Sequence, residues 1–353
     1  MQAAAAVKKQ YYGLDIAKAI MAVLIIGVHR SPFSGAIANL IFKETFGRLA
    51  VAVFFAAAGF IFFGKTLREK HGGFKRLLRY LSRLALLYGA WSLLYLPAAL
   101  YRFDTAANGV GRFFLSYVKR CALDAPMIHL WYIPALAVAV STVFLLLKKL
   151  PPGAVFAVGA ALYVCYTALE EFSVLTEKIP PAGQLALWLA AFPVRWLING
   201  IFVGFAFVSA GAFAASKEWK AGMGVRGTAA LLSVCALLAE VFIVNRSGLA
   251  SKPEHYLLFV PACLAVLLLA SKADLKERRV YLKLREISVL LYFSHLLVIT
   301  EWYDLLFSGT WLAGAARTGA FFFAFTLAYS LLFSAAVLLL EKLKPLRFLK
   351  YLH

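Results

Sequence analysis

Asp15, Lys18 and His29 are ionisable residues in an otherwise apolar segment, GLDIAKAIMAVLIIGVHRSPF (residues 13–33). Lys18 and His29 are eleven residues apart. In a helix this spacing places them on one face, about 16 Å apart along the axis. A neutral imidazole can take a proton from a hydroxyl or attack an acyl carbon, and an ammonium group can bind an anion. The segment therefore predicts a helix with a cation at one end, which Asp15 can pair, and an acid–base group at the other.

An ordinary membrane helix offers a second interpretation of the same residues. Lys18 would extend its ammonium group to the inner interface, and His29 would cap the outer end of the span. These residues alone leave both interpretations open.

A second basic group precedes the third apolar run. The stretch KRLLRYLSRL (75–84) places Arg76, Arg79 and Arg83 on one helical face. Guanidinium groups bind phosphate oxygens through two parallel hydrogen bonds. The same arginines could instead anchor the helix at the cytoplasmic surface by touching lipid phosphates, and the two roles are compatible.

The elements that must position these residues are membrane helices. The chain of 353 residues is 63% hydrophobic, outside the range of soluble domains. Apolar runs of about 17–25 residues recur along it. We count about ten: 14–33, 49–64, 77–100, 127–147, 153–169, 185–214, 227–244, 255–271, 287–307 and 316–340. The longest connections, 65–76 and 101–126, are loop-sized. We therefore predict an all-α, polytopic integral membrane protein, with one transmembrane domain over residues 1–353 and no separate soluble domain.

The net charge of +20 is a topology signal. With the N-terminus inside, 24 Lys and Arg residues fall in inner segments and 10 in outer loops. The positive-inside rule then places both termini in the cytoplasm. Basic charge would also attract anionic membrane lipids, and no nucleic-acid partner is expected. The four cysteines show no CxxC spacing, so no metal site is predicted.

These motifs resemble the acyltransferase 3 family of integral membrane acyltransferases. That family has a lysine or arginine, ten residues and then a histidine in its first span, as Lys18 and His29 have here. VAVFFAAAGFIFF (51–63) is similar to its second-span motif, with Ala58 in place of the usual serine. HLWYIPALAVA (129–139) and REISVLLYFSHLLVI (285–299) match two later motifs. HRSPF, WYIPAL and RWLINGIFVG resemble the branch that includes the membrane domain of vancomycin-resistance serine racemases.

The resemblance implies transfer of an acyl group, commonly acetyl, from cytoplasmic acyl-CoA to a hydroxyl of an extracytoplasmic acceptor. The acceptor would be a cell-surface glycan or its precursor, and the location the bacterial cell membrane. His29 would be the acid–base group or the acyl carrier. Lys18, Arg76, Arg79 and the nearby Arg83 would hold the donor phosphates, although the proline that usually follows the last arginine is missing.

A carboxylate partner for His29 is expected, and three candidates stay open. Glu240 lies among apolar residues in LLAEVFIVNR, whereas Glu341 in LLLEKLKP resembles the closing glutamate motif of the family. Glu301 follows the late histidine run.

The acceptor side has its own candidates. His129 and Trp131 begin the fourth run, where they could bind acceptor or form an interfacial aromatic belt. Arg195 lies in the outer half of the sixth run and needs a partner or a water-filled cavity. His295 is in mid-span and is either a site residue or a core histidine.

The intramembrane polar groups also fit an alternative function, a membrane transporter for a small metabolite such as serine. Transporters often carry inverted repeats, and none is visible in this sequence. The acyltransferase interpretation requires one passage that joins a basic inner entrance to His29.

Overall fold

The computed structural model describes residues 10–69, 72–176, 178–248, 250, 253–273, 275–299, 307, 309–311 and 319–353. Regular structure in these residues is helical, and no strand occurs among them. The all-α prediction is confirmed. Glu301 lies outside the described residues.

The N-terminal half contains the helices that carry Lys18, His29 and the arginine group. A 31-residue rod follows the first helix and includes a short π-helical stretch, η1. The bounds are α1 (Tyr12–His29), α2 (Ala36–Leu40), η1 (Ile41–Gly47), α3 (Arg48–Thr66), α4 (Gly73–Arg102), α5 (Thr105–Asn108), α6 (Val110–Leu123), α7 (Tyr132–Leu146) and α8 (Pro152–Glu170).

The C-terminal half completes the bundle. Its helices are α9 (Ser173–Thr176), α10 (Pro180–Ala191), α11 (Arg195–Ile198), the π-helix η2 (Asn199–Gly204), α12 (Phe205–Ser216), α13 (Met223–Ser247), α14 (Phe259–Ser271), α15 (Arg279–Leu297), α18 (Gly319–Leu340) and the 3₁₀-helix η4 (Lys344–Leu352).

Among the described residues, seven helical segments are long and apolar enough to cross a membrane: 12–29, 36–66, 73–102, 152–170, 195–216, 223–247 and 319–340. Two shorter apolar helices, α7 and α14, match two further predicted runs. The protein is therefore a polytopic membrane protein. The count of about ten spans and the cytoplasmic location of both termini stay predictions.

Two of the predicted segments were wrong. The sixth run, 185–214, is broken after α10 and resumes at α11. Pro193 explains the break, because it lacks an N–H and disfavours helical geometry at the residue before it. The connection 101–126 was predicted to be a loop but contains α5 and α6. Its charged residues concealed an amphipathic helix, since charges on one face interrupt an apolar run without breaking a helix.

Small residues bring α3 and α12 into close contact. A Cβ atom at Gly59 would meet the backbone of Val208, and one at Gly211 would meet the carbonyl of Ala56. In a bilayer, such close backbone approach favours helix association through van der Waals packing. Helices α1 and α14 pack against α3, and α7, α8 and α14 pack against α12.

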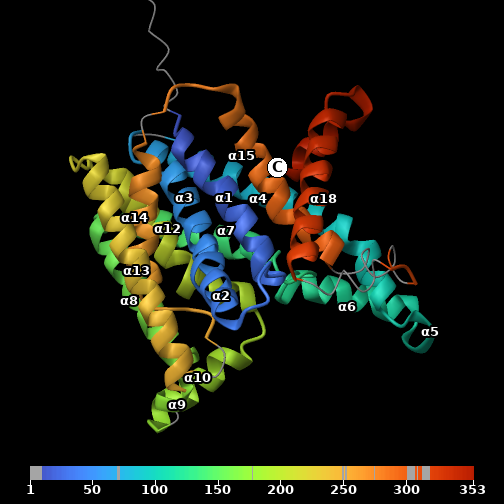
Figure 1. The fold of residues 1–353 in the computed structure, drawn as a ribbon, viewed down its shortest axis with the longest axis horizontal. Helices are drawn as coiled ribbons and strands as arrows, with labels where there is room; N and C mark the ends of the chain where they lie inside the picture. Colours follow the sequence, from blue (N-terminus) through green and yellow to red (C-terminus); the bar gives the residue numbers. More distant parts are fainter. Residues whose placement is uncertain are drawn as a thin grey trace, which may run out of the picture.

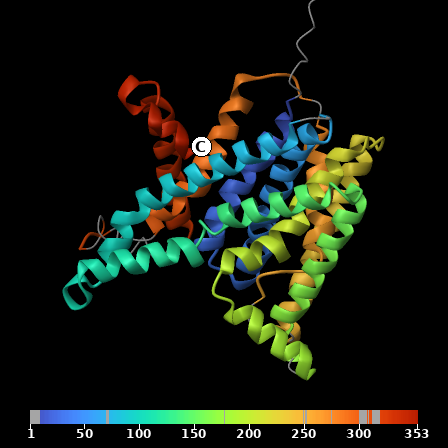
Figure 2. The ribbon, with the colours of Figure 1, turned by 180° about the vertical axis from the view of Figure 1, so that it is seen from behind.

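The first helix, α1, carries both Lys18 and His29 and has several helices around it. It packs against α3, α14 and α15 along its length (Figure 1). On one side, α5 and the adjoining ends of α4 and α6 project from the body of the bundle (Figure 2). The end of α1 that carries His29 therefore meets α15 and the base of this projection.

Candidate functional site

Three histidines from distant parts of the sequence lie in a row. His29 ends α1, His295 is near the end of α15, and His129 is in the turn before α7. The ring centroids of His29 and His295 are 5.2 Å apart, and those of His295 and His129 are 5.3 Å apart. We call these three residues the histidine row. Since α1 and α15 pack together, the contact between their histidines is a direct consequence of the fold.

Hydrogen bonds fix the orientation of two imidazoles in the row. The Nε2–H of His129 donates to the carbonyl of Phe293 at 3.2 Å, and Nδ1–H of His295 donates to the carbonyl of Leu291 at 3.3 Å. A carbonyl can only accept, so these nitrogens carry the protons. The other nitrogens, Nδ1 of His129 and Nε2 of His295, have no hydrogen-bond partner among the described residues. Each is therefore a buried acceptor that a substrate or a neighbouring N–H could use.

Tyrosines hold the frame around the row. The Tyr95 hydroxyl donates to the Phe293 carbonyl at 2.6 Å, and the Tyr292 hydroxyl donates to the His129 carbonyl at 3.2 Å. The ring of Tyr95 also packs edge-on against His129. Because these bonds join α4, α15 and the turn before α7, they fix the row from three sides.

His29 opens onto a cavity of about 480 Å³, which we call the His29 cavity. This volume is in the range of small-molecule binding sites. Apolar side chains form much of its wall: Phe103, Phe113, Met127, Ile128, Leu296 and Ile299. Three arginines line it as well: Arg30, Arg102 and Arg120. The sequence analysis did not select them, because they are 18 to 90 residues apart and only the α4–α6 projection brings them together.

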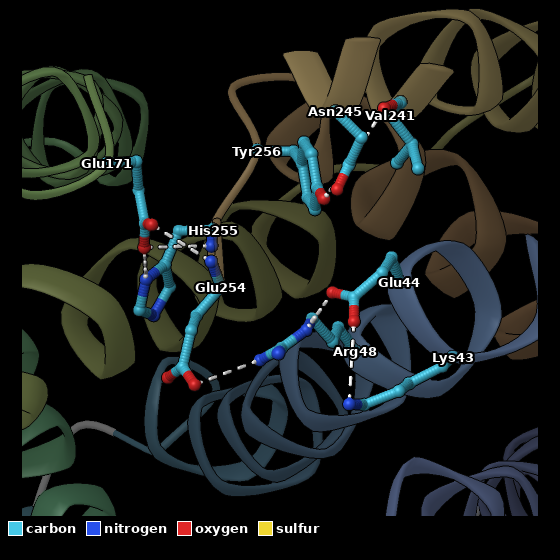
Figure 3. A network of polar contacts seen from close by, with 9 residues as sticks. All are labelled: Lys43, Glu44, Arg48, Glu171, Val241, Asn245, Glu254, His255 and Tyr256. Carbon is cyan, nitrogen blue, oxygen red and sulfur yellow. Dashed lines mark hydrogen bonds and ion pairs between the residues drawn. The ribbon is translucent and has the colours of Figure 1, made fainter. Parts of the chain in front are cut away.

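Three cations contribute to the electrostatic field at His29: Arg30, Lys43 and Arg48. Arg48 is held by the Glu44 carboxylate and by Glu254, whose carboxylate is 3.6 Å from Nη1 of Arg48. Figure 3 shows this network beside α3. No hydrogen bond or ion pair joins His29 to a carboxylate among the described residues, whereas His255 and His353 each have one.

The network of Figure 3 continues to the end of α8. Glu171 accepts the backbone N–H groups of Glu254 and His255, and Nδ1–H of His255 at 2.6 Å. This clamp fixes the segment before α14, and with it Glu254, against Arg48. His255 is thus a structural residue and lies in a different cluster from the histidine row.

The opposite end of α1 is built on an ion-pair cluster. Asp15 is buried, with its carboxylate 3.8 Å from Nζ of Lys18. The predicted pairing of Asp15 with Lys18 is thus present. Arg285 of α15 donates to both oxygens of Asp15, at 2.9 and 2.7 Å. This bidentate bond is the stronger contact, and no local sequence pattern predicts it because the partners are 270 residues apart.

The arginine group on α4 lies on the surface. Arg76 pairs with Glu69, whereas Arg79 and Arg83 are exposed. A second cavity, of about 240 Å³, lies at the start of α1 beside Tyr11, and we call it the Tyr11 cavity. Its basic lining residues are Arg68, Lys217 and Lys272, none of which the sequence analysis had selected.

The structure gives Glu240 and Glu341 partners other than His29. Glu240 accepts the backbone N–H groups of Leu257 and Leu258 at 2.7 and 2.8 Å, which caps the start of α14. Glu341 contacts Nε2 of His353 at 2.8 Å. A carboxylate in an apolar helix can satisfy unpaired backbone donors, and half-buried Glu240 has this structural use.

The residues predicted to bind the acceptor lie in different parts of the structure. His129 and His295 lie in the histidine row. The ring of Trp131, two residues after His129, packs against Phe55. Nη1 of Arg195 donates to the carbonyls of Leu189 and Ala190, so this arginine caps the end of α10.

Comparison with known proteins places this architecture in a family. The acyltransferase domain model named Acyl_transf_3 matches residues 11–339. The chain therefore belongs to the acyltransferase 3 family. Membership supports acyltransferase activity at a membrane.

Curated relatives carry racemase names. An amino-acid racemase from Enterococcus faecalis is 24% identical over 300 residues, 83% of this chain and 41% of the relative. A serine/alanine racemase from Enterococcus gallinarum is 23% identical over 260 residues, 71% of this chain and 36% of the relative. The chain thus spans less than half the length of these relatives. The names agree with the predicted resemblance to the racemase branch, and no solved structure matches the chain.

Proposed function

We propose that this protein transfers an acyl group, with acetyl the first candidate, from acyl-CoA to a hydroxyl of an extracytoplasmic acceptor. The acceptor would be a cell-surface glycan or its precursor, and the enzyme would act in a bacterial cell membrane. One observation carries the proposal: α1 begins at a basic cavity and ends at a histidine that lines a second cavity. The two cavities would give donor and acceptor separate entrances. They have no lining residue in common, so the passage between them that the mechanism requires would have to open when the donor binds.

The donor would enter beside Tyr11. Acyl-CoA carries several phosphate charges, and Arg68, Lys217 and Lys272 line the cavity there. Lys18 lies farther along α1, with His29 about 16 Å beyond it. An extended pantetheine arm could cover a distance of this order. The exposed Arg79 and Arg83 would attract the donor to this face without holding it.

The reaction would occur beside His29. As the acceptor oxygen attacks the thioester carbon, the imidazole takes the hydroxyl proton and the carbon–sulfur bond breaks. The thiolate leaves as CoA and receives a proton, so the products are the ester and free CoA. In the acyl-carrier version, the imidazole nitrogen attacks the thioester carbon first, and the carbon–sulfur bond breaks to release CoA. The acceptor hydroxyl then attacks the acyl-imidazole and loses its proton, so that the ester forms and the imidazole is restored. His295, 5.2 Å from His29 between ring centroids, would help to orient the imidazole.

Acyl transfer in purified membranes tests this proposal. Labelled acetyl-CoA is supplied to membranes that contain the wild-type protein or His29→Ala, and label in envelope material is counted. We expect His29→Ala to lower the rate by about 10²–10⁴-fold, the usual contribution of a positioned acid–base group. His353→Ala, which removes an imidazole outside both cavities, is the matched control. Wild-type activity in His29→Ala would contradict the mechanism.

A second candidate function is a membrane transporter for serine, which the racemase names of the relatives suggest. Uptake of labelled serine into proteoliposomes without acyl-CoA would support it. Acyl transfer without uptake would reject it.

A further inference from the structure

We infer that the His29 cavity binds a phosphate group of the acceptor, so that the acylated molecule is a phosphate-bearing sugar or polyol. The inference rests on the proposed function and specifies its acceptor. Its carriers are Arg30, Arg102 and Arg120, which line the cavity together with His29.

The described lining of the His29 cavity is positively charged. Among its described lining residues there are three arginines and no aspartate or glutamate. No ion pair is found for Arg30 or Arg120 within the described part of the chain, whereas Arg48 and Arg285 each have a carboxylate. All three side chains are exposed, so a ligand can reach them, and cations gathered beside a cavity raise the local concentration of anions.

The three arginines come from three separate parts of the fold. Arg30 follows α1, Arg102 ends α4, and Arg120 lies in the last turn of α6. The guanidinium group of Arg30 is stacked 4.8 Å from the ring centroid of Phe322, which holds its plane and leaves its N–H edges available. Three separate elements thus bring their arginines to one cavity.

The number of donors favours phosphate over carboxylate. One guanidinium fork satisfies the two oxygens of a carboxylate, but a phosphate offers three acceptor oxygens and up to two charges. Phe103 and Phe113, which also line the cavity, suit the apolar face of a sugar or polyol chain. A phosphate held by these arginines would set a neighbouring hydroxyl beside His29, because Arg30 is the next residue in the chain.

Binding of a matched ligand series tests the inference without any acyl transfer. The purified protein in maltoside micelles is titrated with glycerol 3-phosphate, glycerate and glycerol, and heat is recorded. We expect glycerol 3-phosphate to bind most tightly and glycerol not to bind. Arg120→Gln should weaken phosphate binding about tenfold or more, the usual effect of losing a charge-assisted hydrogen bond. Arg120→Lys, which keeps the charge without the fork, should fall in between.

Arg112→Gln is the matched control on the same helix. Arg112 contacts Asn108 and does not line the cavity, so this variant should bind phosphate as the wild type does. Gel filtration of each variant verifies folding. Equal weakening by Arg112→Gln and Arg120→Gln, tighter binding of glycerate, or no phosphate binding by the wild type would overturn the inference.

Two further measurements complete the test. One identifies the source of the phosphate, and the other tests the proposed donor separately from this inference. If phosphatidylglycerol in nanodiscs displaces glycerol 3-phosphate, the natural phosphate belongs to a lipid; if it does not, the phosphate belongs to a soluble or polymeric acceptor. Both results support the phosphate site. Acetyl-CoA binding is measured in parallel: its absence would reject the proposed donor, while unchanged acetyl-CoA binding without phosphate binding would reject only this inference.

Discussion

The two ends of α1 differ in whether the cations around them are paired with a carboxylate. At the Lys18 end, Asp15 is buried between Lys18 and Arg285 and neutralises part of their charge. At the His29 end, Arg30 and Arg120 line a cavity without an ion pair among the described residues. Paired cations hold helices together, whereas unpaired ones beside a cavity are available to a ligand. The comparison predicts that the Asp15 ion-pair cluster governs stability and that the His29 cavity governs acceptor binding.

Asp15→Asn should give the largest change in stability. It leaves Lys18 and Arg285 without their shared anion, and we expect the free energy of unfolding to fall by about 2–3 kcal/mol. This figure is below the usual range for buried pairs because the Arg285 side chain is 41% exposed. Arg120→Gln should change stability by less than about 0.5 kcal/mol. Denaturant titration in micelles measures both, and a larger loss for Arg120→Gln would reverse the assignment of the two ends.

A matched pair of arginine variants should produce a smaller effect, on donor binding. Arg68→Gln removes a cation that lines the Tyr11 cavity, so the KM for acetyl-CoA should rise about tenfold. Arg79→Gln removes an exposed cation outside that cavity, and screening should limit its effect to about threefold. Steady-state kinetics at two salt concentrations compare them. The opposite order would return the donor site to the arginine group on α4.

The sequence was most informative where the signal is local. Apolar runs predicted membrane helices, and helical spacing predicted that Lys18 and His29 share α1 and that Asp15 pairs with Lys18. Long-range contacts left no such trace: Arg285 reaches Asp15 across 270 residues, and His295 reaches His29 only because α15 packs on α1. Arg102 and Arg120 of the His29 cavity were counted as loop charges and Arg30 as the end of a span, since nothing in the sequence of α6 shows which element it packs against.

Glu240→Gln should have the smallest effect and tests whether its role is structural. The amide keeps one acceptor oxygen where the carboxylate bonded two backbone N–H groups, so we expect a loss of stability of about 1 kcal/mol. Acyl transfer should be unchanged once folded protein is quantified. A rate loss as large as that of His29→Ala would make Glu240 part of the catalytic group after all.

Sidedness of transfer tests most directly whether the two ends of α1 do separate jobs. Labelled acetyl-CoA is added outside sealed vesicles in which the protein is oriented either as in the cell or inverted. The account predicts transfer only in inverted vesicles, where the Lys18 end faces the added donor, with the label appearing on the enclosed side. Equal transfer in both orientations, or label retained on the donor side, would contradict it.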